Sequence, residues 1–140
     1  MSTKVDILDA LVAELLAIDE VKTATRYVQT FTEASQNNPS VQVTAGAETI
    51  LVNDATDIYY ALQISLLVIT KQTSQNIEPL IDDIKDALLG TTCPLSLHAN
   101  IQVINLIATE IVELEDEDAE EFASAILSLE IRYHASKTGF

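Results

Sequence analysis

Residues 58–71 read Ile-Tyr-Tyr-Ala-Leu-Gln-Ile-Ser-Leu-Leu-Val-Ile-Thr-Lys, and this stretch decides the fold class. Its side chains alternate between two faces and many are β-branched, which is typical of a long β-strand. One face carries Tyr60, Leu62, Ile64, Leu66 and Val68. The opposite face carries Ala61, Gln63, Ser65, Leu67 and Ile69. The stretch therefore predicts a strand with at least one strongly apolar face.

Two amphipathic helices are predicted, one over residues 3–18 and one over residues 75–89. Thr3 and Asp6 have the spacing of a capping box, whereas Ser74 is a candidate N-cap and Gly90 a helix stop. Apolar residues repeat at helical spacing in both segments. They are Ile7, Leu8, Leu11, Leu15 and Leu16 in the first, and Ile77, Leu80, Ile81, Ile84 and Leu88 in the second.

Between the first helix and residue 58 the pattern is weaker. Residues 21–31 are rich in Thr, Val and Tyr and predict a first strand. After a polar loop, residues 41–44 and 49–52 predict two short strands. The segment around Gly46 that separates them is expected to turn.

The C-terminal part combines two apolar segments with an acidic segment between them. Residues 100–112 and 122–133 read as strands, and seven of the nine residues 113–121 are acidic. Unpaired charges are costly to bury, so the acidic segment is expected to form the exposed tip of a long β-hairpin. Its acidic residues are Glu113, Glu115, Asp116, Glu117, Asp118, Glu120 and Glu121.

These elements predict one α+β domain that spans residues 1–140. We expect a mainly antiparallel mixed sheet with two helices packed on one face and a long C-terminal β-hairpin. The sequence contains no internal repeat or linker that would mark a second domain.

The formal charge of −15 limits the partners of the chain. Phosphate binding normally uses clustered Lys and Arg, but the seven basic residues here are scattered along the sequence. Direct nucleic-acid binding and binding to an anionic membrane are therefore disfavoured. The longest apolar run is also far shorter than the roughly 20 residues that span a bilayer.

The acidic segment invites comparison with a calcium loop. Asp116, Asp118 and Glu120 alternate as in an EF-hand, but Glu121 stands where glycine is required and Leu127 where the bidentate Glu belongs. A solvated loop that keeps two apolar strands from aggregating is the favoured interpretation, and a weak divalent-ion site is the alternative.

No catalytic motif is evident. Cys93 and His98 are an isolated pair without an orienting partner or a four-ligand zinc pattern. The chain has three glycines and no phosphate-binding loop. We therefore expect no enzyme activity, no cofactor and no metal.

The second face of the strands suggests self-association. A single helix layer covers one face of a sheet, whereas the other face is also partly apolar here. Tyrosine is enriched at protein interfaces, which adds one aromatic residue to the candidates. The candidate subunit-interface residues are Tyr59, Ile101, Val103 and Ile107. An additional layer within the monomer is the competing explanation.

The whole-chain pattern resembles the tail-terminator proteins of long-tailed bacteriophages, the family of the lambda-type minor tail protein U. After an amphipathic opening helix, the resemblance rests on four short motifs. They are Ile18-Asp19-Glu20-Val21, Tyr59-Tyr60-Ala61-Leu62, Leu89-Gly90 and Leu129-Glu130-Ile131-Arg132-Tyr133. It covers nearly all 140 residues, as a similarity of order, length and texture.

This resemblance implies a structural virion protein that forms a ring, usually a hexamer. The ring would cap the tail tube, stop its polymerisation and join the tail to a head-completion or neck protein. It would be assembled in the host cytoplasm and lie in the tail-neck region. Genomic DNA would pass through the lumen without specific binding, since an acidic lumen repels it. Two alternatives remain: another neck or tail-tube subunit, or a small non-phage cytoplasmic binding module.

Overall fold

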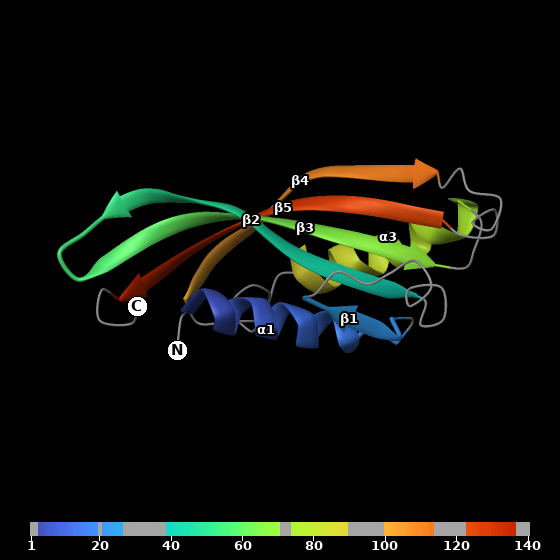
Figure 1. Ribbon diagram of the computed structural model, residues 1–140, viewed down its shortest axis with the longest axis horizontal. Helices are drawn as coiled ribbons and strands as arrows, with labels where there is room; N and C mark the ends of the chain where they lie inside the picture. The colour runs from blue at the N-terminus through green and yellow to red at the C-terminus, as the bar shows by residue number, and fades with distance from the viewer. Residues whose placement is uncertain are drawn as a thin grey trace.

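The computed structural model describes residues 3–19, 21–26, 39–70, 74–89, 100–113 and 123–136. These residues contain two helices and five strands in the predicted order (Figure 1). In chain order the elements are α1 (Thr3–Leu16), β1 (Thr23–Thr25), β2 (Ser40–Asn53), β3 (Asp57–Thr70), α3 (Ser74–Leu89), β4 (Ile101–Glu113) and β5 (Ala123–Ser136). The predicted α+β class is confirmed.

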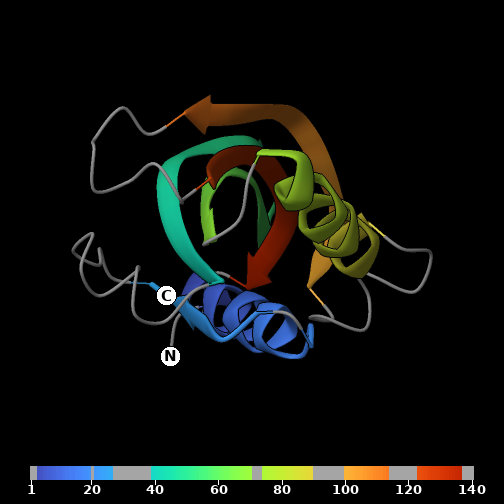
Figure 2. The same cartoon turned by 90° about the vertical axis from the view of Figure 1, so that its right-hand side faces the viewer.

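The five strands form one mixed sheet in the order β1-β2-β3-β5-β4. The pair β1 and β2 is parallel, whereas β2–β3, β3–β5 and β5–β4 are antiparallel. The sheet is strongly curled, and α1 and α3 lie together on one side of it (Figures 1 and 2). We call the face toward the helices the inner face and the opposite one the outer face.

The core lies between the inner face and the two helices. Residues of β3 and β5 that face each other in register form its centre, such as Leu62 with Ile131 and Leu66 with Leu127. All five residues of the apolar face predicted for β3 are buried, from Tyr60 to Val68. The apolar stripes of α1 and α3 join the same cluster, except for Leu16, which was predicted to belong to the stripe of α1 but is 47% exposed at its end. Fully burying each Leu or Ile contributes roughly 1.5–3 kcal/mol, which explains why the stripe positions dictate the packing.

The strand β2 differs from the prediction. The structure has one continuous 14-residue strand, Ser40–Asn53, where the sequence predicted two short strands and a turn at Gly46. A register shift lies between Ala45 and Glu48, so Gly46 lies in a bulge-like irregularity and not in a turn. The prediction of a turn was wrong because glycine in a strand marks a bulge as readily as a chain reversal.

The two faces of β4 also differ from the prediction. Ile101 pairs with Tyr133 and Val103 with Arg132, which are neighbours on β5, so these two residues lie on opposite faces. Register shifts between Ile101 and Val103 and between Leu106 and Ala108 change the alternation. Strict period-2 counting was wrong here because each bulge moves the following side chains to the other face.

The first predicted strand is short in the structure. Within the described residues 21–26, β1 covers Thr23–Thr25, and residues 27–38 lie outside the described residues. Backbone hydrogen bonds from the amides of Lys22 and Thr23 to the carbonyl of Pro39 place β1 beside the start of β2.

Candidate functional site

Most of the acidic segment lies outside the described residues. Glu113 ends β4, and the other six acidic residues of the segment follow it before the first described residue of β5. The pair β4–β5 is antiparallel up to Glu113 and Ala123. Cys93 and His98 also lie outside the described residues. The candidate roles of all these residues stay predictions.

The four candidate interface residues are placed differently from one another. Ile101 is 1% exposed and belongs to the core, so it offers no surface to a partner. Val103 and Tyr59 are half-buried, and the Tyr59 ring lies 5.7 Å from the His134 ring, measured between centroids. Ile107 is 58% exposed, at a bulge in β4.

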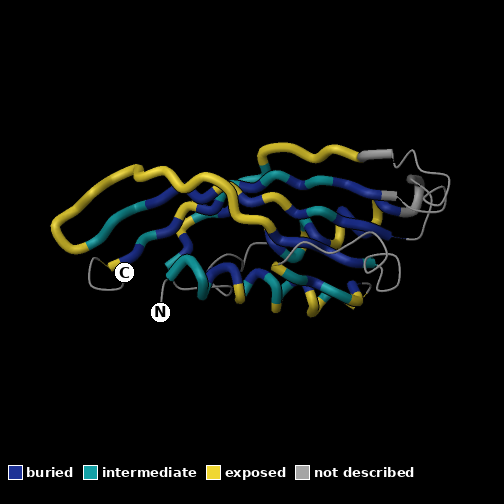
Figure 3. Tube along the Cα trace, in the orientation of Figure 1, coloured by how far each residue is buried: buried dark blue, intermediate teal, exposed yellow. Residues whose placement is uncertain are grey.

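A long hairpin arm is the most exposed part of the described structure. Residues 44–56 are all exposed, and they include most of β2 and the turn into β3 (Figure 3). In Figure 1 the tip of this arm, where β2 turns into β3, extends beyond the end of α1. The turn is held by a hydrogen bond from the Asp54 amide to the Asp57 carbonyl, at 2.8 Å. The amide of Ala55 donates to the Asp54 carboxylate at 2.6 Å.

The arm carries apolar side chains near its tip. Ile50, Leu51 and Val52 are 57%, 44% and 55% exposed. Single exposed apolar residues are common on protein surfaces, and here three of them follow one another in one strand. The sequence predicted a strand at these positions, but gave no signal that it would project from the core.

A tyrosine pair at the level of Ile50 links the arm to β5. The Tyr133 hydroxyl of β5 donates a hydrogen bond to the Glu48 carboxylate of β2, at 2.5 Å. The Tyr133 and Tyr60 rings stack with centroids 5.2 Å apart. Burial raises the pKa of the Tyr133 hydroxyl, and the hydrogen bond to Glu48 raises it further. Burial and the Glu48 charge likewise raise the pKa of Tyr60.

A second polar cluster lies on the outer face across β3 and β5. The Arg132 guanidinium donates to the Glu130 carboxylate at 2.7 Å, and the Gln63 amide donates to the same carboxylate at 3.3 Å. The hydrogen bond from Arg132 is the main cause that lowers the pKa of Glu130. The Gln63–Glu130 contact joins β3 to β5, whereas Arg132 and Glu130 both belong to β5.

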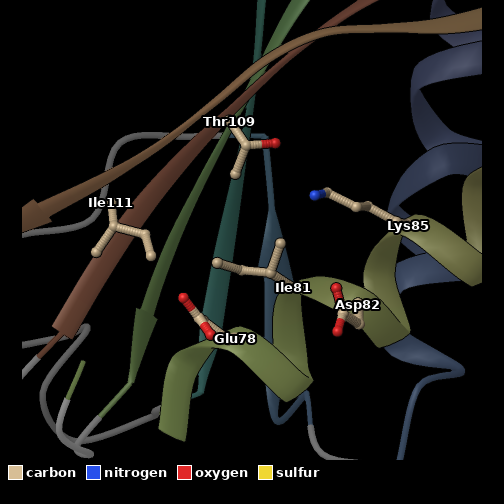
Figure 4. Close-up of a pocket in the computed structure, with 6 residues that line it drawn as sticks. All are labelled: Glu78, Ile81, Asp82, Lys85, Thr109 and Ile111. Atoms are coloured by element: carbon tan, nitrogen blue, oxygen red, sulfur yellow. The ribbon is translucent and has the colours of Figure 1, made fainter. Parts of the chain in front are cut away.

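A small hollow lies between α3 and the second half of β4 (Figure 4). Its volume is about 190 Å³, and its lining combines charged and apolar side chains. The lining residues are Glu78, Ile81, Asp82, Lys85, Thr109 and Ile111. Ligand pockets usually have volumes of about 300–1,000 Å³, so this hollow is too small for a typical substrate.

Neither a metal centre nor a membrane span appears in the described part of the chain. No group of three or more His, Cys, Asp and Glu side chains converges there to hold a metal ion. No helix of the structure is long and apolar enough to cross a membrane, as far as the residues are described. The described surfaces that expose large apolar side chains include the arm and the edge strand β4.

Comparisons with known proteins identify a related fold. No family model matches the sequence. No curated protein matches it either. Among solved structures, the chain is similar to a chain described as "Virion of native gene transfer agent (GTA) particle". That similarity has a TM-score of 0.58 and 14% sequence identity, and covers 96% of each chain. At this identity it establishes a shared fold.

A second solved chain is less similar. It is described as "Cryo-EM Structure of an Extracellular Contractile Injection System, PVC sheath/tube terminator in extended state". The TM-score is 0.48 and the identity 10%, over 99% of this chain and 60% of the other. The present chain thus spans about three-fifths of that protein's length.

Proposed function

We propose that this chain is a structural subunit of a phage-like tail, of the tail-terminator type. The observation that carries the proposal is the fold shared with a virion chain over 96% of both chains. The sequence resemblance to tail terminators, which is independent of that comparison, supports the same class. No catalytic role is proposed.

In this proposal, several copies form a closed ring that caps the tail tube. We propose a hexamer, in which one ring face binds the last ring of tube protein and stops further addition. The other face binds a head-completion or neck protein. Contacts in which one patch of each subunit meets a different patch of the next generate a ring when the rotation closes. The exposed arm supports such contacts, because it offers apolar surface outside the core.

The acidic residues have a proposed place in this ring. If the segment 113–121 lines the lumen, DNA passes through without adhering, because like charges repel over about 8 Å at physiological salt. Replacing the carboxylates of that segment by amides should then increase the retention of labelled DNA by assembled rings. Unchanged retention would place the segment on the rim of the ring.

Native mass spectrometry together with negative-stain electron microscopy tests the proposed function. We expect closed rings of one stoichiometry and of about the diameter of a tail, at micromolar protein with and without magnesium. Open tubes would favour a tube subunit instead. A monomer at every protein and magnesium concentration would favour a small binding module and would contradict the proposal.

A further inference from the structure

The sheet has two free edges, one on β2 and one on β4. Among the described residues, β1 pairs with β2 at Ser40–Gln42, and no strand pairs with that side of β2 beyond Gln42. At the other end of the sheet, β4 pairs with β5 on one side and with no described strand on the other. Within the part of the chain that the structure describes, each subunit therefore presents two long strand edges on which no further strand is paired.

We propose that the free edge of β2 in one copy pairs with the free edge of β4 in the next copy. This inference rests on the proposed ring and names the surfaces that build it. The sheet of each subunit would continue into its neighbour, so that every copy uses both edges once. Strand addition of this kind gains affinity from main-chain hydrogen bonds.

The strand directions suit this pairing. Three successive antiparallel pairs separate β2 from β4, so the two strands run in opposite directions. A second copy added in the same orientation would thus pair its β4 antiparallel to β2. Antiparallel ladders are slightly more stable per residue than parallel ladders.

The free stretches of β2 and β4 also lie opposite each other across the sheet. Two residues are called level when successive strand pairs connect them from β2 through β3 and β5 to β4. Following the register from strand to strand, Val43 is level with Thr109 and Ile50 is level with Ile101. In contrast, β1 blocks β2 at the level of β4 residues 110–112. The part of β2 that β1 leaves free is thus matched by residues 101–109 of β4.

The distribution of charge favours contact between copies at these edges. Residues 101–109 contain no charged side chain, and residues 43–53 contain only Glu48, in a chain with 22 acidic residues. The Glu48 carboxylate accepts the hydrogen bond from Tyr133 of its own subunit. Edges exposed to water usually carry charges, Lys above all, that prevent pairing. Two strongly acidic copies can meet here without opposing their carboxylates.

The exposed apolar residues are found at the same two edges. Ile50 and Val52 belong to the arm, and Ile107 and Ile111 belong to β4, each at least 40% exposed. Both strands contain bulges, between Ala45 and Glu48 in β2 and between Leu106 and Ala108 in β4. Bulges bend a strand and increase its twist. A sheet that continues from copy to copy can therefore curve, as a closed ring requires.

Two single substitutions test the pairing separately at each edge. Ile50→Lys places an ammonium group on the β2 edge, and Ile107→Lys places one on the β4 edge. Each lowers the net negative charge, so a loss of assembly cannot come from greater repulsion between copies. We expect each variant alone to be monomeric where the unmodified chain forms rings. Leu16→Lys is the matched control, because Leu16 is 47% exposed at the end of α1, and it should assemble normally.

Mixing the two edge variants distinguishes this pairing from a symmetric one. The Ile50→Lys copy keeps its β4 edge, and the Ile107→Lys copy keeps its β2 edge. An equimolar mixture should form dimers with one copy of each variant and no rings, measured by native mass spectrometry. Dimers of a single variant would overturn the pairing, since they require an edge to bind its own kind.

Hydrogen exchange on the unmodified protein gives a result that does not depend on the variants folding. In the assembled protein, the amides of residues 43–50 and 101–109 that point to the free side of each edge should exchange at least tenfold more slowly than in the same protein diluted until it is monomeric. Rings whose edge amides gain no protection, or that form equally with both edge variants, would overturn the pairing and leave the proposed ring intact. Open tubes that show this protection would support the pairing and overturn the terminator role.

Discussion

At the scale of single residues, Tyr133 and Glu48 matter most for the position of the arm. They are 85 residues apart in the sequence, and their hydrogen bond joins β5 to β2 across β3. Tyr133 is 2% exposed, and its ring stacks on Tyr60. A polar contact and an aromatic contact therefore coincide where the arm lies beside β5.

The first prediction concerns Tyr133→Phe. The ring stack survives this change and the hydrogen bond is lost, so the free energy of unfolding should fall by about 1 kcal/mol. Tyr59→Phe is the matched control and should cost clearly less. Urea unfolding at pH 8 measures both values, and equal losses would contradict a specific role for the Tyr133 hydroxyl.

The same contact has a defined alkaline pH dependence. The pKa of Tyr133 is raised in the folded state, so its contribution to stability is complete below the unfolded pKa of about 10. As pH rises beyond that value the unfolded tyrosine ionises first, and the contribution is lost. The difference in stability between the unmodified chain and Tyr133→Phe should therefore shrink between pH 8 and pH 10.5.

The second prediction concerns Glu130→Gln on the outer face. Arg132 lowers the pKa of Glu130 in the folded state, so the contribution is present above the unfolded pKa of about 4.3. It is lost as pH falls through the lowered folded value. The unmodified chain should have the higher urea midpoint at pH 7, and the gap should narrow as the pH falls below the unfolded pKa. A gap that stays constant with pH would contradict the assignment.

At the scale of elements, the irregularity in β2 determines whether a side chain is tolerated at position 46. A Cβ added at Gly46 would lie 3.5 Å from the Gln63 carbonyl oxygen and 3.6 Å from the Gln63 Cβ, which is ordinary contact. The strand therefore has room for a side chain, whereas a tight turn would have required glycine.

The third prediction follows from that room. Gly46→Ala should leave stability unchanged or raise it by up to about 1 kcal/mol, because alanine restricts the unfolded chain. Thermal unfolding followed by circular dichroism measures the effect. A loss of more than about 1 kcal/mol would indicate a backbone conformation that only glycine adopts.

The elements also explain how far the sequence could predict the fold. In β3 every residue of the predicted apolar face is buried, and so are the β5 residues paired with it, because regular alternation places Leu62 opposite Ile131. Bulges defeated the prediction in β2 and β4, since no local pattern indicates where a strand gains an extra residue. Ile101 was thus expected at an interface and lies in the core. The contact of Tyr133 with Glu48 depends on a strand order that the sequence does not reveal.

At the scale of the whole molecule, charge and self-association oppose each other. Every copy carries a formal charge of −15, so copies that approach one another repel. Salt weakens this repulsion, because the Debye length falls from about 10 Å at 0.1 M to about 3 Å at 1 M. Contacts between nearly uncharged strand edges are not weakened in the same way.

The fourth prediction is therefore that salt strengthens assembly. Raising NaCl from 0.1 M to 1 M should lower the protein concentration at which oligomers form, measured by sedimentation velocity. The Ile50→Lys variant is the control and should stay monomeric at both concentrations. Dissociation of the unmodified oligomer in 1 M NaCl would instead indicate that ion pairs hold the copies together.

The strand order also determines when the sheet can form during translation. The central strand β3 pairs with β5. Leu62 can contact its partner Ile131 only after roughly seventy further residues have been synthesised. At about 5–20 residues per second this takes roughly 4–14 s. During that interval β3 can pair only with β2, so one apolar edge of the hairpin stays open on the ribosome. A nascent chain that ends before β5 should consequently be the species that chaperones bind most strongly.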